Sequence, residues 1–157
     1  MIDSNDFSLQ NYLDTLASEY RRKDFTVQYQ PFIYGADFVP INTTVTAEVG
    51  VAIDHDADFI LASQTFVCFE TGGLVNLAPN MLVSLSDQSS QRQLQNEPLH
   101  LAGTFGTGQR PFMYFKPLVL RRRSTLLVTV TNNTLQNQNL RLSFQGVKAY
   151  TTRARRG

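Results

Sequence analysis

The sequence has one cysteine, no tryptophan and no apolar run near the roughly 20 residues of a membrane-spanning helix. The single thiol, Cys68, excludes an internal disulfide, and with two scattered histidines it leaves no zinc-ligand pattern. The net charge is only +1, which argues against a general nucleic-acid binder. Asp3 and Asp6 stand where a secretory signal needs positive charge, so no such signal is expected. These 157 residues predict one domain without cofactor, nucleic acid or membrane as partner.

The sequence also has few charged residues and many neutral polar ones. Charged residues are 17% of the chain and apolar ones 42%, so the chain is globular but its surface is rich in Thr, Ser, Asn and Gln. After Lys23 apolar and polar residues alternate in many short runs, as from Val45 to Ile53 and from Leu126 to Val130. Alternation indicates strands with one packed face and one wet face. The fold class expected is mainly β, an antiparallel β-sandwich or jelly roll with a short N-terminal helix or arm.

The first segment is the one good helix candidate. Apolar residues recur at spacings of three and four, whereas Gln10 and Asp14 fall on the opposite face. About three turns are too short for a stable helix in water, so the apolar stripe needs a partner surface. That surface is either the chain's own β domain or another subunit. The stripe consists of Leu9, Tyr12, Leu13, Leu16 and Tyr20.

The residues between this helix and the first clear strand are apolar but interrupted. Pro31, Gly35 and Pro40 make a regular central strand improbable there, and an irregular ribbon is expected. Residues 1–40 are therefore assigned to an N-terminal helix and irregular arm. Residues 41–157 are assigned to the β-sandwich with a basic C-terminal tail.

Two local patterns resemble ligand-binding loops without completing them. Gly103 and Gly108 have the spacing of a phosphate-binding loop, but its Lys and Ser or Thr are missing, so a sheet connection is expected. Asp54, Asp56 and Asp58 alternate as in a calcium loop, but the turn glycine and the closing Glu are absent. A solvated turn, salt-bridged to an arginine, is expected instead of a metal site. Replacing the three acids by Asn is expected to change stability little.

No catalytic set is recognisable, and a non-enzyme is expected. Cys68 lies in an apolar run, where a thiol behaves as a small hydrophobe. His55 and His100 are isolated from each other and from any nucleophile motif. The basic runs around Arg122 and Arg155 are read either as a contact with an acidic partner or as a solvated turn and tail.

From Val45 to Tyr150 the order of segments resembles a known group of proteins. The acidic turn after Ile53 is followed by the polar loop after Leu85, a glycine loop entering Gln109-Arg110-Pro111-Phe112, and Arg122-Arg123-Ser124-Thr125-Leu126. The chain closes on Leu142-Ser143-Phe144-Gln145-Gly146-Val147-Lys148. This texture is similar to small jelly-roll structural proteins of tailed bacteriophages, the capsid decoration or cement proteins.

The resemblance implies a non-enzymatic virion protein on the outer surface of the capsid, present in the host cytoplasm before assembly. Its implied partners are the major capsid protein, whose subunits it bridges, and copies of itself as a dimer or trimer. Aromatic and apolar residues of the first 40 are the expected contact residues. They are Phe7, Leu9, Tyr12, Leu13, Leu16, Tyr29, Phe32 and Tyr34, with Ile33 beside them.

The alternative is a carbohydrate-binding β-sandwich of a phage tail or fibre. It needs an exposed aromatic platform beside amide side chains, which Tyr114 near the Asn- and Gln-rich loops would supply.

Overall fold

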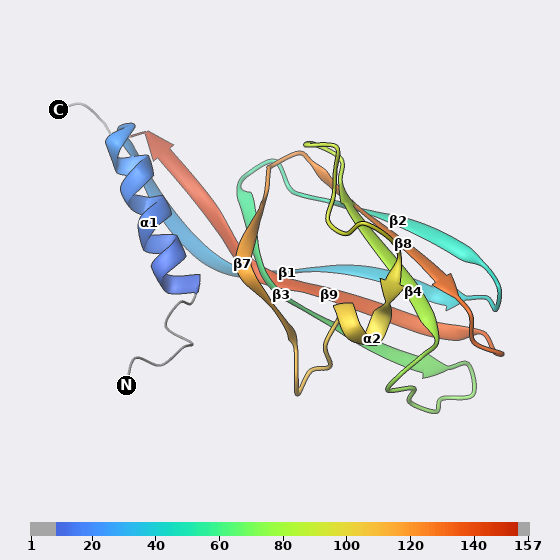
Figure 1. Cartoon of the computed structure of the whole chain (residues 1–157). Helices are drawn as coiled ribbons and strands as arrows, with labels where there is room; N and C mark the ends of the chain where they lie inside the picture. The colour runs from blue at the N-terminus through green and yellow to red at the C-terminus, as the bar shows by residue number, and fades with distance from the viewer. Residues whose placement is uncertain (1–8, 154–157) are drawn as a thin grey trace.

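The computed structural model describes residues 9–153 and consists of two antiparallel sheets packed face to face, with a helix at one end (Figure 1). The β-sandwich predicted from the alternation is confirmed. The first sheet has the strand order β1-β9-β3-β7, and the second has β2-β8-β4-β5 with β6 also paired to β4. The elements are α1 (Leu9–Arg22), β1 (Phe25–Ile41), β2 (Thr46–Ala52), β3 (Asp58–Glu70), β4 (Met81–Asp87), β5 (Arg92–Gln93), β6 (Leu99–His100), α2 (Leu101–Thr104), β7 (Phe112–Leu120), β8 (Thr125–Asn132) and β9 (Gln138–Arg153).

The strand pairs are nested in the order of a jelly roll. The first strand, β1, pairs with the last, β9. Moving inward along the chain, β2 pairs with β8 and β3 pairs with β7. The innermost strand, β4, pairs with the two short strands that follow it. This nesting wraps one long hairpin around the core, so that each sheet receives alternate pairs.

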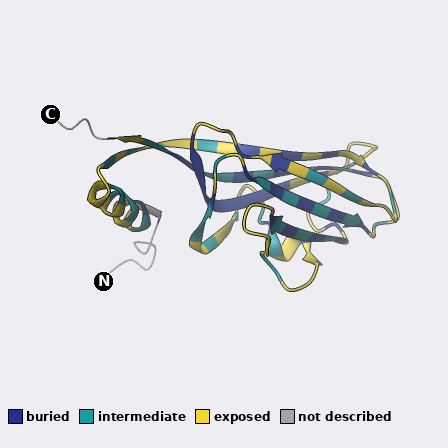
Figure 2. Cartoon of the chain, turned by 90° about the horizontal axis from the view of Figure 1, so that it is seen from above, coloured by how far each residue is buried: buried dark blue, intermediate teal, exposed yellow. Residues whose placement is uncertain are grey.

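The core follows directly from the period of two in the sequence. Along β4, Met81, Val83 and Leu85 are buried, whereas the residues between them are partly exposed. Figure 2 shows the same alternation of buried and exposed residues along the other strands. The inner faces of both sheets supply one large cluster that includes Phe59 and Phe144, and Phe105, directly after α2, packs into it.

The segment after the helix is not the irregular ribbon that its prolines predict. Residues 25–41 form one strand, β1, paired with β9 from Phe25 to Phe38 before the register shifts near Pro40. The prediction is wrong because β1 is an edge strand. An edge strand leaves one side of its backbone unpaired, so the missing N–H of Pro31 does not interrupt the sheet.

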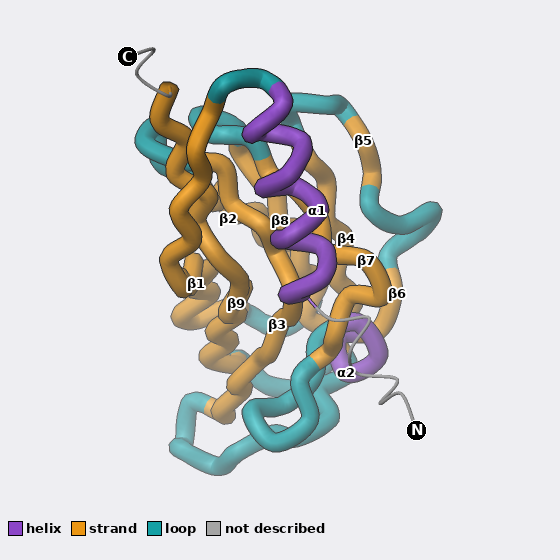
Figure 3. The backbone as a smooth tube through the Cα atoms, turned by 90° about the vertical axis from the view of Figure 1, so that its left-hand side faces the viewer, coloured by secondary structure: helices purple, strands orange, loops and turns teal. Residues whose placement is uncertain are grey.

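The predicted helix is confirmed, and it packs on its own chain. The side chain of Leu13 is 5% exposed and lies with Ile60, Val147 and Ala149 in a second, smaller apolar cluster. These three sheet residues are on the outer face of the first sheet, and Figure 3 shows α1 in front of β9 and β3. The sequence left open whether the apolar stripe packs on the chain's own β domain or on another subunit. The described side chains of α1 pack on the chain's own β domain.

Candidate functional site

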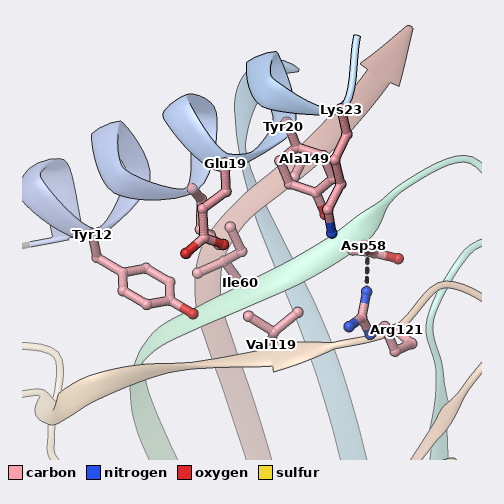
Figure 4. Close-up of a pocket in the computed structure, with 10 residues that line it drawn as sticks. Tyr12, Glu19, Tyr20, Lys23, Asp58, Ile60, Val119, Arg121 and Ala149 are labelled. Atoms are coloured by element: carbon pink, nitrogen blue, oxygen red, sulfur yellow. Dashed lines mark hydrogen bonds and ion pairs between the residues drawn. The ribbon is translucent and has the colours of Figure 1, made fainter. Parts of the chain in front are cut away.

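A cleft of about 290 Å³ lies between α1 and the outer face of the first sheet (Figure 4). Its apolar floor comes from the sheet, through Ile60, Val119 and Ala149. The helix contributes Tyr12 and Tyr20 to its wall, since these residues are two turns apart on one face. Between these walls, Leu13 packs against Ile60, Val147 and Ala149, with Tyr12 and Leu16 beside it.

Charged side chains surround this cleft. Glu19 comes from the helix and Lys23 directly follows it, whereas Asp58 begins β3 and Arg121 directly follows β7. Asp58 is well buried and accepts hydrogen bonds from the backbone N–H of Arg122 at 2.9 Å and from its Nε at 3.2 Å. Arg121 reaches the other carboxylate oxygen at 3.5 Å and remains mostly exposed.

The arginine run is therefore a turn between β7 and β8 in which two members hold Asp58. The arginine partner expected for the acidic turn is confirmed for Asp58. Arg123 adopts a left-handed backbone conformation at this turn, with a φ of 64°.

Tyrosines fasten the helix to the sheet. The Tyr29 hydroxyl donates a hydrogen bond of 2.7 Å to the carbonyl oxygen of Leu13. Burial, followed by the negative charge of nearby groups, raises the pKa of both Tyr29 and Tyr12. The cleft presents apolar side chains, the hydroxyls of Tyr12 and Tyr20, and charged groups of both signs.

The structure divides the predicted contact residues into two groups. Tyr12, Leu13, Leu16 and Tyr29 meet in the seam between helix and sheet. Phe32 and Tyr34 lie on the opposite face of β1, inside the sandwich, with ring centroids 4.8 Å apart. Leu13 and Tyr34 are buried within the chain and offer no surface to a partner, which corrects their assignment as contact residues. Phe7 and the side chain of Leu9 lie outside the described residues.

A buried lysine, missed in the sequence, organises the acidic turn between β2 and β3. Lys148 projects to the inner side of β9, where its Nζ is 2.7 Å from Oδ2 of Asp54 and 3.2 Å from Oδ1 of Asp56. The same Nζ lies 4.0 Å from the centroid of the Phe32 ring. The turn between β2 and β3 is therefore held at the end of the core by ion pairs and is not a freely solvated loop. Two features of the sequence could have indicated this ion pair. A lysine stands within the mostly apolar run Gly146 to Tyr150, and the acidic turn has no Lys or Arg of its own.

Burial opposes the charge on Lys148, but its hydrogen bonds to the two acids raise its pKa above the ordinary value. The hydrogen bond from Lys148 is the main cause that lowers the pKa of Asp54. Desolvation opposes ionisation of Asp56, yet bonds from Lys148 and Tyr150 lower its pKa overall. Among residues 9–153, no three His, Cys, Asp or Glu side chains are grouped so as to hold a metal ion.

Two other predictions concern single residues. Cys68 is buried, its thiol donates to Oε1 of Gln138, and burial raises its pKa to about 11, as expected of a structural cysteine. Tyr114 is not the exposed platform that a sugar site needs. Its hydroxyl donates to Oε1 of Gln64 at 2.8 Å, its ring packs edge-on to Phe112, and burial strongly raises its pKa.

The glycine loop is a sheet connection, as predicted, but it also contains the short helix α2. Gly106 forms an isolated bridge with Thr65 of β3, and a side chain there would collide with the backbone of Arg110 and Pro111. The glycine thus allows two backbones to approach closely, and no phosphate-binding role is needed to explain it.

No family model matches the chain, and no curated protein matches it. Neither helix within residues 9–153 combines the length and apolar character needed to cross a membrane. The basis for a function is therefore the topology and the surface of the chain itself.

Proposed function

We propose that this chain is a non-enzymatic structural protein of a tailed-bacteriophage virion, a head decoration or cement protein. It binds the outside of the capsid shell and bridges neighbouring subunits of the major capsid protein. Its gain in particle stability comes from contact area added at subunit boundaries, repeated over the symmetric shell.

The observation that carries this proposal is the nested strand order β1·β9, β2·β8, β3·β7 and β4·β5. Jelly rolls of this kind are common building blocks of virus particles, although lectin domains and cupins share the architecture. The segments that resemble phage decoration proteins, from Val45 to Tyr150, supply every strand of the sandwich except β1 and the last residues of β9.

The surface supports a role in assembly. Large apolar side chains stand exposed along β7 and around the end of β3, including Phe115, Met113 and Phe69. Large exposed apolar side chains are typical of interaction surfaces when they gather in patches, and Phe115 and Met113 lie on the same strand. Tyr114, the residue that would best have supported a carbohydrate site, is committed to internal packing.

The direct test is binding to particles. Capsids that lack this protein are prepared from a phage in which its gene is deleted. They are mixed with the purified protein and sedimented, and the number of bound copies per capsid is measured. We expect saturable binding at a fixed ratio to major capsid protein and a higher temperature of capsid disruption. A glycan array serves as the opposing arm, and binding there without binding to capsids would refute the proposal.

A matched control separates specific from general adhesion. Phe115→Ser changes a fully exposed side chain and should weaken binding if β7 faces the shell, whereas Leu135→Ser changes an equally exposed residue of the β8–β9 turn. Equal loss in both variants would indicate nonspecific apolar adhesion.

A further inference from the structure

Three basic segments that are far apart in the sequence meet at one end of the molecule. Arg153, near the end of the chain, pairs with Phe25 at the start of β1, and Figure 1 shows the end of α1 beside the head of β9. The Arg122 guanidinium donates to the Thr151 hydroxyl at 3.2 Å, so the β7–β8 turn lies against the same end of β9. The cations brought together are Arg21, Arg22, Lys23, Arg121, Arg122, Arg123 and Arg153, half of the 14 in the chain.

Most of these cations have no acid to neutralise them. Arg121 is 3.5 Å from Asp58, and its side chain is still 69% exposed. Within residues 9–153 the other exposed cations of this end form no salt bridge. They are Arg21, Arg22, Lys23, Arg123 and Arg153. Asp24, which follows Lys23, has an interaction of its own. An anion that approaches this end therefore meets a group of unpaired cations.

The other acids nearby leave this charge largely uncancelled. Asp58 accepts hydrogen bonds from the β7–β8 turn, whereas Asp54 and Asp56 are paired with the buried Lys148. Glu19, in the wall of the cleft beneath α1, forms no salt bridge within the described chain. Its charge opposes a carboxylate inside the cleft, so an acidic partner has to place its carboxylates at the mouth.

The cleft itself opens among these cations. Lys23 and Arg121 both line it, and in Figure 4 their side chains lie on opposite sides of Asp58. The floor is apolar, as described above. With a volume of about 290 Å³ the cleft is just below the roughly 300 Å³ at which pockets for drug-sized ligands begin. It therefore suits one large apolar side chain rather than a whole cofactor.

We propose that this end of the molecule binds an acidic segment of another protein. One large apolar side chain of that segment fills the cleft, and carboxylates on both sides of it face the cations around the mouth. Guanidinium groups match carboxylates with paired hydrogen bonds, and six of the seven cations are arginines. The buried side chain anchors the segment, while the opposite charges orient it and accelerate its association. A nucleic acid has phosphates for the cations but no apolar side chain for the cleft, so the acidic segment is the occupant that uses both features.

The first test uses a fluorescein-labelled peptide in which one leucine is flanked on each side by two glutamates. Fluorescence anisotropy with the full-length protein should give saturable binding that weakens as salt is added, because the contacts are exposed. The same peptide with glutamines for glutamates should bind more than about tenfold more weakly. The peptide with serine for leucine should lose about tenfold, since it cannot fill the cleft. Absence of saturable binding, or equal affinity for either control peptide, would overturn the proposal.

A matched pair of variants tests the location. Arg153 and Arg141 are both exposed and stand on the same side of β9, but twelve residues, or roughly 40 Å, apart. Arg153→Gln combined with Lys23→Gln should raise the dissociation constant of the glutamate peptide about fivefold. Arg141→Gln combined with Arg110→Gln makes the same change in net charge and should alter it less than about twofold. Equal weakening by the two double variants would show general attraction by net charge and refute the site.

A labelled oligonucleotide with four phosphates provides the opposing arm. Tighter binding of this oligonucleotide than of the glutamate peptide, lost in the Arg153→Gln and Lys23→Gln variant, would assign this end to nucleic acid and reject the acidic segment. The inference goes beyond the proposed function and can fail separately from it, because none of these measurements needs particles. A protein that binds capsids but none of the peptides would keep the proposed function and reject this inference.

Discussion

The ammonium of Lys148 lies 2.7 Å from Oδ2 of Asp54, a residue 94 positions earlier in the chain. The lysine side chain is 4% exposed, whereas the carboxylate remains half exposed. One end of this ion pair is therefore inside the sandwich and the other end is at its surface. The β2–β3 turn closes over the core through this contact and the neighbouring one to Asp56.

The first prediction concerns the removal of either side of this contact. Asp54→Asn with Asp56→Asn leaves a buried cation without its counterions, whereas Lys148→Met leaves two carboxylates that water can solvate. We expect the double Asn variant to lower the melting temperature more than Lys148→Met does. This replaces the expectation from the sequence that the acids of the turn contribute little. Asp37→Asn, an exposed acid of β1 without a salt bridge in residues 9–153, is the control and should have little effect. The opposite ranking of the two variants would show that the buried charge is not the controlling feature.

The second prediction is acid sensitivity. The pKa values of Asp54 and Asp56 are lowered in the folded state, so the unfolded chain binds protons first as the pH falls. Their contribution to stability is complete at neutral pH and is lost from about pH 5 downward, increasingly below about pH 4. Melting temperature measured between pH 7 and pH 3 should fall more steeply for the wild type than for the double Asn variant. Parallel curves would contradict this assignment.

The third prediction concerns the close approach of β9 and β3 at Gly146. A Cβ added there would lie 1.9 Å from the carbonyl oxygen of Ile60, a backbone atom that cannot move aside. We expect Gly146→Ala to reduce the free energy of unfolding by about 1–3 kcal/mol, as overpacking does. Gly103→Ala meets no atom within 4 Å and should be nearly neutral. Urea denaturation of both variants gives the comparison, and equal stabilities would show that the strands separate easily.

The fourth prediction concerns the docking of the helix. Leu13→Ala removes the centre of the small cluster and should cost about 2–3 kcal/mol of unfolding free energy. Thr15→Ala changes an exposed position of the same helix and should cost much less. Because the main core is a separate cluster, deleting residues 1–23 should leave a folded sandwich with an exposed apolar patch that binds a hydrophobic dye. Loss of the β-sheet circular dichroism signal on deletion would place the helix within the folding core.

Local pattern in the sequence was sufficient for the type of most elements. The spacing of Leu9, Leu13 and Leu16 predicts the helix that the structure has, and alternation predicts the strands and the sandwich. The polar stretches after Leu85 and after Val130 contain the connections from β4 to β5 and from β8 to β9. These features are recoverable because the period of an amphipathic element depends only on neighbours along the chain.

The position of each element in the sheets is not a local property. Pro31 argues against a strand until it is known that β1 is at the edge, where one side of the backbone has no partner. Phe32 and Tyr34 look like surface anchors until β9 pairs with β1 and turns their side of the strand inward.

Periodicity and turn residues encode local conformation, so a mostly β chain with one short amphipathic helix could be predicted from the sequence alone. The pairing of Lys148 with Asp54, and the packing of α1 on the outer face of the first sheet, became visible with the three-dimensional fold. Those outcomes depend on strand pairing between residues far apart in the chain. Pairing of that kind depends on the joint burial of all the strands, so it cannot be predicted from any single segment.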